Sequence, residues 1–344
     1  MGVSLRQLVT PQELSLEQLR GKVVLVDAMN MLYQFVTTIR QYDGTPLKDS
    51  QGNVTSHLTG LFARCTRLMM KGIKLAFVFD GKMPELKAAE RARREALKAE
   101  AVSALKSAQE SNDVEAMKKY AGRASKVSKD MVEESKALLT ALGIPVVQAP
   151  SEGEAQAAFM VAQGDGEFVA SQDFDCLLYG APRMIRNLSL SQRRKKINAV
   201  TYKTILPEIL TLEDTLQELE LSLTQLRALG MLVGTDFSIG GVKGLGPKKS
   251  LKLVREQGDD LQAIFAAAEW DEHQEASWEE VYEILSNMPT TKDYTLEWND
   301  VDEAAVKEIL VERHDFREER ITQVLADIEA EKKKGRQTGL GQFM

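Results

Sequence analysis

Short apolar runs rich in β-branched and aromatic residues recur along the chain, and three of them end in an aspartate. Runs of this length and composition predict buried parallel strands. Stretches of helical composition lie between them, so the pattern predicts an α/β fold with a mostly parallel central sheet flanked by helices. The candidate strands are 23–27, 75–80, 145–147 and 167–173, and the candidate helices are 55–71, 132–142 and 152–163.

Residues 84–130 interrupt this alternation. They contain no β-branched runs and are rich in Ala, Lys, Arg and Glu, a composition that favours long helices. Eleven Lys or Arg stand against eight Asp or Glu, so this helical insertion is locally basic. Its few apolar residues predict loose packing, which fits both a solvated helical hairpin and an element that becomes ordered on a ligand.

The composition of the 344 residues narrows the classes of function. With 43% hydrophobic residues, the chain can bury a large core in one domain with insertions or in two domains. Cys65 and Cys176 cannot form a disulfide framework and lack a paired Cys/His spacing, so we expect a reducing compartment and no zinc site. No apolar run approaches the roughly 20 residues of a membrane span, and the N-terminus lacks the order of a signal peptide.

The net charge of −7 would argue against a nucleic-acid partner if the charges were evenly spread. What binds phosphate is the local field, however, and the basic residues of this chain are clustered. The charge balance therefore leaves a nucleic-acid partner open.

Seven acidic residues stand where the predicted fold would gather them. Two end strands, and two follow Ser151, a predicted N-cap, which puts them in the first turn of a helix, where the helix dipole alone could account for them. Two more are spaced by two and would face the same side of an extended segment, and the last follows a Gly-Thr pair. The seven are Asp27, Asp80, Glu152, Glu154, Asp173, Asp175 and Asp236.

Taken singly, each of these residues is more often a surface carboxylate or a helix cap. The carboxyl ends of parallel strands meet at one edge of a sheet, so the fold would bring the seven together. Seven carboxylates at one place must bind cations or take up protons. Oxygen ligands without His or Cys favour Mg²⁺ or Mn²⁺, and two such ions can generate hydroxide and stabilise the leaving oxygen in phosphodiester hydrolysis.

The motifs around these carboxylates resemble, in order and spacing, the flap endonucleases of the XPG-like structure-specific nuclease family. The resemblance covers nearly the whole chain and implies a PIN-like nuclease core. The matching segments are 26–35, 78–82, 149–156, 171–180 and 234–237, the last followed by Gly-Leu-Gly-Pro-Lys at 244–248.

The resemblance implies an enzyme that cuts 5′ single-stranded DNA flaps at their junction with duplex, with a 5′–3′ exonuclease activity besides. It implies the seven acidic residues as ligands of two Mg²⁺ ions, with Mn²⁺ as a substitute. Lys87 and Arg94 match the family's catalytic basic pair at the base of a helical arch, and their spacing of seven puts them on one helix face. Tyr33 matches an aromatic that stacks on a base, although an isolated tyrosine here would be read as a core residue.

Further DNA contacts follow from the same resemblance. Segment 84–130 resembles the arch through which the 5′ flap threads, and Arg40 joins the DNA-binding set. The turn at 244–250 resembles a helix-hairpin-helix element that binds duplex DNA with a K⁺ ion, while a plain helix C-cap turn is the alternative. Its implied contacts are Gly244, Gly246, Lys248 and Lys249. Residues 193–196, Arg-Arg-Lys-Lys, fit either a solvated loop or a contact with duplex phosphates.

The C-terminus resembles a motif that binds the sliding clamp (PCNA). The anchors are Gln337, Leu340, Phe343 and Met344, where Met344 replaces the usual second aromatic. We expect a flexible tail over 331–344 that carries this motif at 337–344. Since eukaryotic relatives carry a further basic extension, the chain resembles the archaeal type, which implies a cytoplasmic monomer that acts in Okazaki-fragment maturation and DNA repair.

We therefore expect one nuclease domain over 1–330, with parts at 1–83, 84–130, 131–235 and 236–330. His57, His273 and His314 have no spacing of a catalytic set and are read as structural or surface residues. Three alternatives stay open from sequence. The chain could be a DNA-binding module without catalysis, a bubble- or junction-specific relative or exonuclease, or an adaptor recruited by the clamp.

Overall fold

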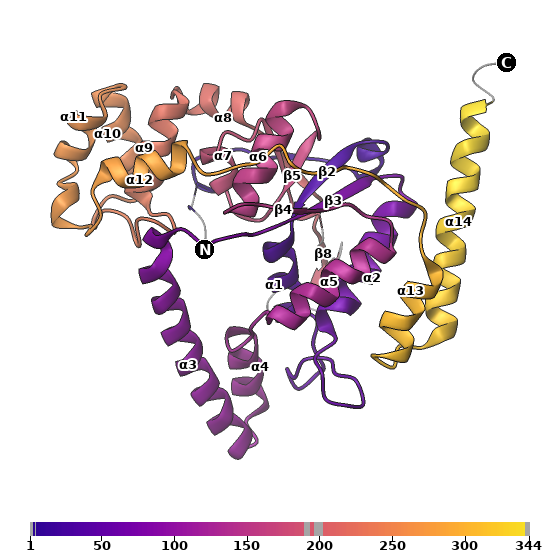
Figure 1. Ribbon diagram of the computed structural model, residues 1–344. Coiled ribbons are helices and arrows are strands. Elements are labelled where there is room, and N and C mark those ends of the chain that lie inside the picture. Colours follow the sequence, from indigo (N-terminus) through magenta and orange to yellow (C-terminus); the bar gives the residue numbers. More distant parts are fainter. Residues whose placement is uncertain (1–2, 4, 189–192, 196–201, 341–344) are drawn as a thin grey trace.

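The computed structural model describes residues 3, 5–188, 193–195 and 202–340. Within these residues, seven strands form one sheet in the order β1-β9-β6-β5-β2-β3-β4 (Figure 1). The strands from β6 to β4 are parallel, and β9 is antiparallel to both of its neighbours, which confirms the predicted mostly parallel sheet. The strands are β1 Gln12–Glu13, β2 Val23–Asp27, β3 Lys74–Phe79, β4 Val146–Gln148, β5 Phe168–Ala170, β6 Arg183–Arg186 and β9 Glu208–Thr211. A separate antiparallel hairpin joins β7 Arg193–Lys195 to β8 Tyr202–Thr204.

The central strands are buried on both faces, which is why their sequences are continuous apolar runs rather than alternating ones. In β2, residues 24–27 are all buried, and the strand pairs with β3 on one side and β5 on the other. The strand stops where the Asp27 side chain accepts a hydrogen bond from the backbone N–H of Asn30 and caps the next helix. This abrupt strand-to-helix change leaves the carboxylate at the edge of the sheet.

Two hydrophobic cores cover the two faces of the sheet. One core packs the sheet against α1, α2, α5, α13 and α14, and the other packs it against α6 to α12 (Figure 1). The first set is α1 Ala28–Thr38, α2 Ser56–Met70, α5 Lys129–Ala141, α13 Glu303–Lys307 and α14 Glu318–Leu340. The second set is α6 Gly153–Gln163, α7 Asp175–Leu178, α8 Leu212–Leu219, α9 Leu223–Val233, α10 Pro247–Gln257, α11 Leu261–Ala267 and α12 Trp278–Ser286. Short turns of helix are η1 Leu16–Leu19, η2 Glu85–Lys87, η3 Trp270–Glu272 and η4 Glu308–Glu312.

The predicted helical insertion forms a hairpin of α3 Ala88–Glu110 and α4 Val114–Arg123 that projects from the body of the protein (Figure 1). The two helices pack through small side chains, since Ala101, Ala108 and Ala121 are buried while Leu97 and Val102 remain half exposed. So little buried apolar surface agrees with the loose packing predicted for this hairpin. The last residues of the predicted segment already belong to α5.

Residues 331–340, predicted as the first part of a flexible tail, continue helix α14 to Leu340. Residues 329–334, Glu-Ala-Glu-Lys-Lys-Lys, are all good helix formers. Ion pairs one turn apart, Lys333 with Glu329 and Lys334 with Glu331, support the helix. Figure 1 shows α14 on the side of the molecule opposite to α10 and α11.

Both cysteines, Cys65 and Cys176, are buried and unpaired, as expected. Among the described residues, no helix has the length and apolar character to cross a bilayer.

Candidate active site

The seven predicted acidic residues come from six separate pieces of the fold. Asp27 ends β2, Asp80 directly follows β3, and Asp173 follows β5. The glutamates lie at the start of α6, Asp175 is the first residue of α7, and Asp236 lies in the turn between α9 and α10. Repulsion or shared polar contacts link every one of them to at least one other, so the structure gathers them at the carboxyl edge of the parallel sheet.

The start of α6 differs from the prediction. Ser151 does not cap the helix, because its hydroxyl donates to the carbonyl of Lys82, and the N-cap residue is Glu152. The backbone N–H of Gly153, at the N-terminus of the helix, instead donates a hydrogen bond of 2.7 Å to Asp80 Oδ1. A Cβ at position 153 would lie 2.8 Å from Asp80 Oδ1, so only glycine allows this approach. The Glu-Gly-Glu motif thus holds a carboxylate of the neighbouring strand.

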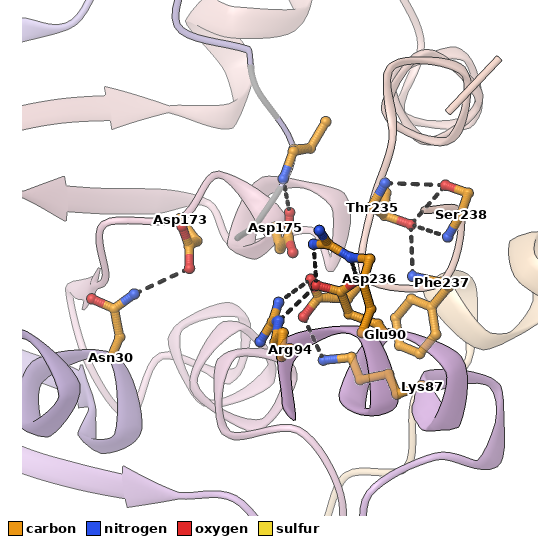
Figure 2. Close-up of polar contacts among 12 residues, drawn as sticks. Asn30, Lys87, Glu90, Arg94, Asp173, Asp175, Thr235, Asp236, Phe237 and Ser238 are labelled. Carbon is orange, nitrogen blue, oxygen red and sulfur yellow. Dashed lines mark hydrogen bonds and ion pairs between the residues drawn. The ribbon is translucent and has the colours of Figure 1, made fainter. Parts of the chain in front are cut away.

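Asp173 and Asp175 do not lie on one extended segment, as the spacing suggested. The backbone of Phe174 is helical, with φ −82° and ψ −3°, and α7 begins at the next residue. The two side chains therefore point in different directions (Figure 2). Asp173 Oδ2 accepts a hydrogen bond from Asn30 at 3.1 Å, and Asp175 Oδ1 accepts the backbone N–H of Val3 at 2.6 Å.

Burial and mutual repulsion make these carboxylates hard to ionise. Burial, reinforced by Asp80 and Asp173, raises the pKa of Asp27 to about 7. Burial and the charge of Asp173 raise the pKa of Asp175 to about 7, although the Val3 N–H opposes this. Burial and repulsion by Asp27 raise the pKa of Glu154 well above its usual range.

Asp80 follows the same rule, since burial and the charge of Glu152 raise its pKa to about 6. Carboxylates whose pKa values are raised this far ionise together only when added positive charge lowers those values.

Two cations from the base of the arch partly neutralise the cluster. Lys87 Nζ lies 2.5 Å from Glu152 Oε2. It also lies 3.3 Å from Asp236 Oδ2, and Arg94 Nη2 lies 2.5 Å from Asp236 Oδ1 (Figure 2). Burial opposes the ionisation of Asp236, but the two cations outweigh it and hold the pKa of this carboxyl below its usual range. The same carboxylates raise the pKa of Lys87 despite its burial.

The donor set fits hard divalent cations. Within the described part of the chain, no three acidic, His or Cys side chains are close enough to form a ready-made metal site as they stand. Lys87 lies between Glu152 and Asp236, and hydrogen-bond donors hold Asp80, Asp173 and Asp175. The all-oxygen donors and their unneutralised charge are nevertheless what Mg²⁺ and Mn²⁺ require.

Comparison with known proteins assigns the fold and the family. The XPG N-terminal domain matches residues 1–101, and the XPG I-region matches residues 143–236. Flap endonuclease 1 of Aeropyrum pernix is 48% identical over 99% of both chains, and that of Hyperthermus butylicus is 46% identical over 100% of this chain and 99% of the relative. The chain belongs to the flap endonuclease family. The structure of flap endonuclease-1 from Methanococcus jannaschii superposes with a TM-score of 0.76 at 36% identity, covering 96% of this chain and 98% of that chain.

The two XPG regions together contain all seven acidic residues as well as Lys87 and Arg94. They leave 102–142, most of the arch hairpin, unmatched. The family signature thus coincides with the edge of the sheet and the base of the arch.

Tyr33, the family's predicted stacking residue, is exposed rather than part of the core. Its side chain is 41% accessible on α1, and Lys98 of α3 lies over the ring at 5.6 Å from its centroid. An exposed aromatic ring beside a cation suits a nucleic-acid base better than a hydrophobic core.

Arg40 has a different environment from the other predicted DNA contacts. Its guanidinium donates to the carbonyls of Val36, Thr37 and Gly44 and to the hydroxyl of Ser125 at the end of the arch. Four of its five N–H groups are therefore engaged within the protein. Through these hydrogen bonds Arg40 links α1, the loop that follows it and the end of the arch.

The predicted helix-hairpin-helix turn joins α9 to α10, and these two helices pack on each other. Gly244 has φ +89°, which glycine adopts without strain, and the space where a Cβ would point is open. Gly246 is the N-cap of α10, followed by a proline at the first helical position. Lys248 and Lys249 are exposed at this N-terminus, which leaves the turn accessible to a phosphate.

The turn also fixes Asp236. The hydroxyl of Thr235 accepts the backbone N–H groups of Phe237 and Ser238, which folds the chain tightly around the aspartate (Figure 2). Phe237 is buried, and Lys87 lies over its ring.

Sequence reasoning missed three polar residues at this site. Asn30 and Ser171 contact the predicted ligands directly, and Glu90 is buried between Arg93 and Arg94. The signals were present, since Asn30 follows Asp27 by one helical turn and Glu90 precedes Arg94 by four residues. Ser171 lies in the same motif as Asp173 and Asp175, and a serine gives no metal-ligand signal of its own.

The predicted clamp motif lies at the far end of α14. Gln337 and Leu340 belong to this helix, whereas Phe343 and Met344 lie outside the described residues. Of the basic segment 193–196, the first three residues form β7, and Lys196 lies outside the described residues. The three histidines lie where structural or surface residues are expected, because His57 and His314 are buried and His273 is exposed.

Proposed function

We propose that the chain is a structure-specific nuclease that hydrolyses a phosphodiester bond where a 5′ single-stranded flap meets duplex DNA. The observation that carries this proposal is the meeting of seven acidic residues with Lys87 and Arg94 at one edge of the sheet. Membership in the flap endonuclease family supports it, since relatives that share nearly half of the sequence are flap endonucleases. A DNA-binding module without catalysis would not need so many carboxylates at one place.

Two Mg²⁺ ions, replaceable by Mn²⁺, are the proposed cofactors, with all seven acidic residues as direct or water-mediated ligands. When bound, such ions activate a water molecule and stabilise charge on the phosphate and on the leaving oxygen. The raised pKa values of Asp27, Asp80 and Asp175 support this assignment, because added positive charge would allow the three to ionise together.

The proposed role of Lys87 and Arg94 is to bind the scissile phosphate. Both cations pair with carboxylates in the structure. Once the negative charge of these carboxylates is balanced by metal, the pair can contact phosphate oxygens instead and offset the charge that develops there. Tyr33, whose ring lies against Lys98 one helical turn after Arg94, would stack on the adjacent base.

Duplex DNA is proposed to bind the turn between α9 and α10 through the N–H groups near Gly244 and Gly246 and through Lys248 and Lys249. A K⁺ ion at this turn belongs to the same proposal. The arch hairpin would hold the single-stranded flap, which agrees with its basic composition. Replication and repair of DNA, in the cytoplasm and as a monomer, is the proposed setting.

The decisive experiment is cleavage of a labelled 5′-flap substrate by Asp173→Ala in Mg²⁺. We expect the variant to lose cleavage while it still binds the flap, because only a metal contact is removed. Cleavage at the wild-type rate would exclude the metal assignment. Bubble and four-way-junction substrates measured side by side test the flap preference, and a faster rate on the junction would replace the proposed substrate.

We further propose that residues 337–344 bind the sliding clamp. The position of α14 opposite the helices of the proposed duplex site supports this, since a clamp there would not compete with DNA (Figure 1). Deletion of 337–344 should leave cleavage of free flaps unchanged and abolish stimulation by the clamp. A chain recruited only as an adaptor would show no cleavage to begin with.

A further inference from the structure

Ser171 is the hydroxyl residue at the centre of the acidic cluster. It directly follows β5 and is only 5% exposed. Its Oγ lies 2.6 Å from Glu154 Oε1 and 3.2 Å from Asp27 Oδ2, and it accepts the backbone N–H of Asp173 at 3.2 Å. One side chain without charge therefore touches three of the predicted metal-binding residues.

Asn30 makes a second set of contacts from the first turn of α1. Its Nδ2 donates to Asp173 Oδ2, its backbone N–H donates to Asp27 Oδ1 at 3.0 Å, and its Oδ1 lies 3.4 Å from the backbone N–H of Gln172 (Figure 2). The residue thus joins α1 to the segment after β5 across the carboxylates.

These contacts determine which carboxylate oxygens are committed within the protein. In the described part of the chain, Asn30 and Ser171 hold one oxygen of Asp173 and one of Glu154, and the second oxygen of each accepts no hydrogen bond. A carboxylate held by one oxygen keeps a fixed orientation and offers the other oxygen to a cation. Groups that orient metal ligands in this way typically change metal affinity by about 10- to 100-fold when they are removed.

We propose that Asn30 and Ser171 are positioning residues that orient Asp173, Glu154 and Asp27 for a divalent cation and so set the affinity of the site for the metal. The inference rests on the proposed function, because it takes these carboxylates as metal ligands. Neither residue touches the substrate in this scheme. Both act only through the carboxylates that they hold.

The test uses Asn30→Ala and Ser171→Ala in the full-length protein, with Ser171→Thr to restore the hydroxyl. Calorimetric titration with Mn²⁺ in the absence of DNA should show affinity weakened by about 10- to 100-fold in the alanine variants. Single-turnover cleavage at saturating flap DNA should need a correspondingly higher Mg²⁺ concentration and recover at high Mg²⁺. Ser171→Thr should restore a Mn²⁺ affinity near that of the wild type.

Ser151→Ala is the matched control. Ser151 is a buried serine in the loop before α6, and its hydroxyl contacts only a backbone carbonyl. This variant should keep the wild-type Mg²⁺ midpoint even if its melting temperature falls, which separates positioning from loss of folding.

The outcomes distinguish the two proposals. If the wild type binds no Mn²⁺, or if Asp173→Ala cleaves normally, the proposed function itself fails. If the wild type binds Mn²⁺ and Asp173→Ala does not, but both alanine variants keep the wild-type affinity and Mg²⁺ midpoint, only the positioning role is overturned.

Discussion

Two clusters of ionisable side chains in this protein differ in how acidic and basic groups are combined. The active-site cluster gathers seven carboxylates around two cations. The histidine cluster, made of Asp49, His57, Glu134 and His314, alternates acids with imidazoles on the face of the sheet covered by α2 and α5. Its contacts are 2.9 Å from His314 Nδ1 to Asp49, 3.1 Å from His314 Nε2 to Glu134, and 3.1 Å from His57 Nε2 to Glu134.

The pKa of Asp49 moves in the opposite direction to the pKa values of Asp27, Asp80 and Asp175. Burial opposes ionisation of Asp49, yet hydrogen bonds from Asn53 and His314 lower its pKa to about 2. Both ring nitrogens of His314 contact carboxylates, one of Asp49 and one of Glu134. The histidine cluster pairs each carboxylate with an imidazole and ties together segments distant in sequence. The active site leaves its charge unbalanced, which makes it a binding site at the expense of stability.

The largest expected effect concerns the two cations of the active site. Lys87→Ala and Arg94→Ala should each lower the single-turnover cleavage rate by about 10²- to 10³-fold, because each removes a positive group aimed at the developing charge. Arg91→Ala is the control, since Arg91 lies on the same helix in an exposed ion pair with Glu95. Equal losses in all three variants would indicate a general effect of arch charge instead.

A second prediction exchanges carboxylates for amides in both clusters. Without metal at pH 8, Asp27→Asn should raise the free energy of unfolding by about 1–4 kcal/mol, because it removes a buried charge whose pKa lies near 7. Glu134→Gln should lower it by about 1–3 kcal/mol, because it weakens contacts to two histidines. Denaturant unfolding in EDTA measures both changes, and the same sign in both variants would contradict the comparison.

A third, smaller effect is the pH dependence of the Asp27→Asn difference. The folded-state pKa of Asp27 is raised to about 7, so its contribution to stability is complete below about 4 and is lost as pH rises through 7. The stability gained by Asp27→Asn should therefore shrink as pH falls from 8 to 5.

The histidine cluster works in the opposite direction. Burial lowers the pKa of His57 even though Glu134 opposes this, so its contribution is present above about 6.5 and is lost as pH falls. The wild type therefore combines two opposing trends, and Asp27→Asn should lose stability more steeply than the wild type on acidification. Parallel melting curves for the two proteins from pH 8 to 5 would contradict the assignment.

The amino-acid pattern was sufficient for four neighbouring parallel strands of the sheet and for a set of acidic residues that lie together at its edge, but not for β1, β6 and β9. Continuous apolar runs predicted β2, β3, β4 and β5, because strands buried on both faces cannot alternate. The sparse apolar residues of 84–130 predicted a weakly packed helical hairpin. Local geometry was less predictable, since Ser151 is not a cap and Phe174 takes a helical conformation that ends the extended segment.

What the sequence determined by itself is the periodic part of the fold and its chemistry: buried strands, helical segments, and carboxylates placed where strands end. Only the tertiary structure decided which groups share a contact. Lys87 meets Glu152 across 65 positions, and His314 meets Asp49 across 265. Ser171 becomes the centre of the acidic cluster only because β2 and β5 are neighbours. The physical reason is the distance along the chain over which each kind of interaction acts. Backbone periodicity acts within a few residues, whereas strand order and packing bring distant side chains together.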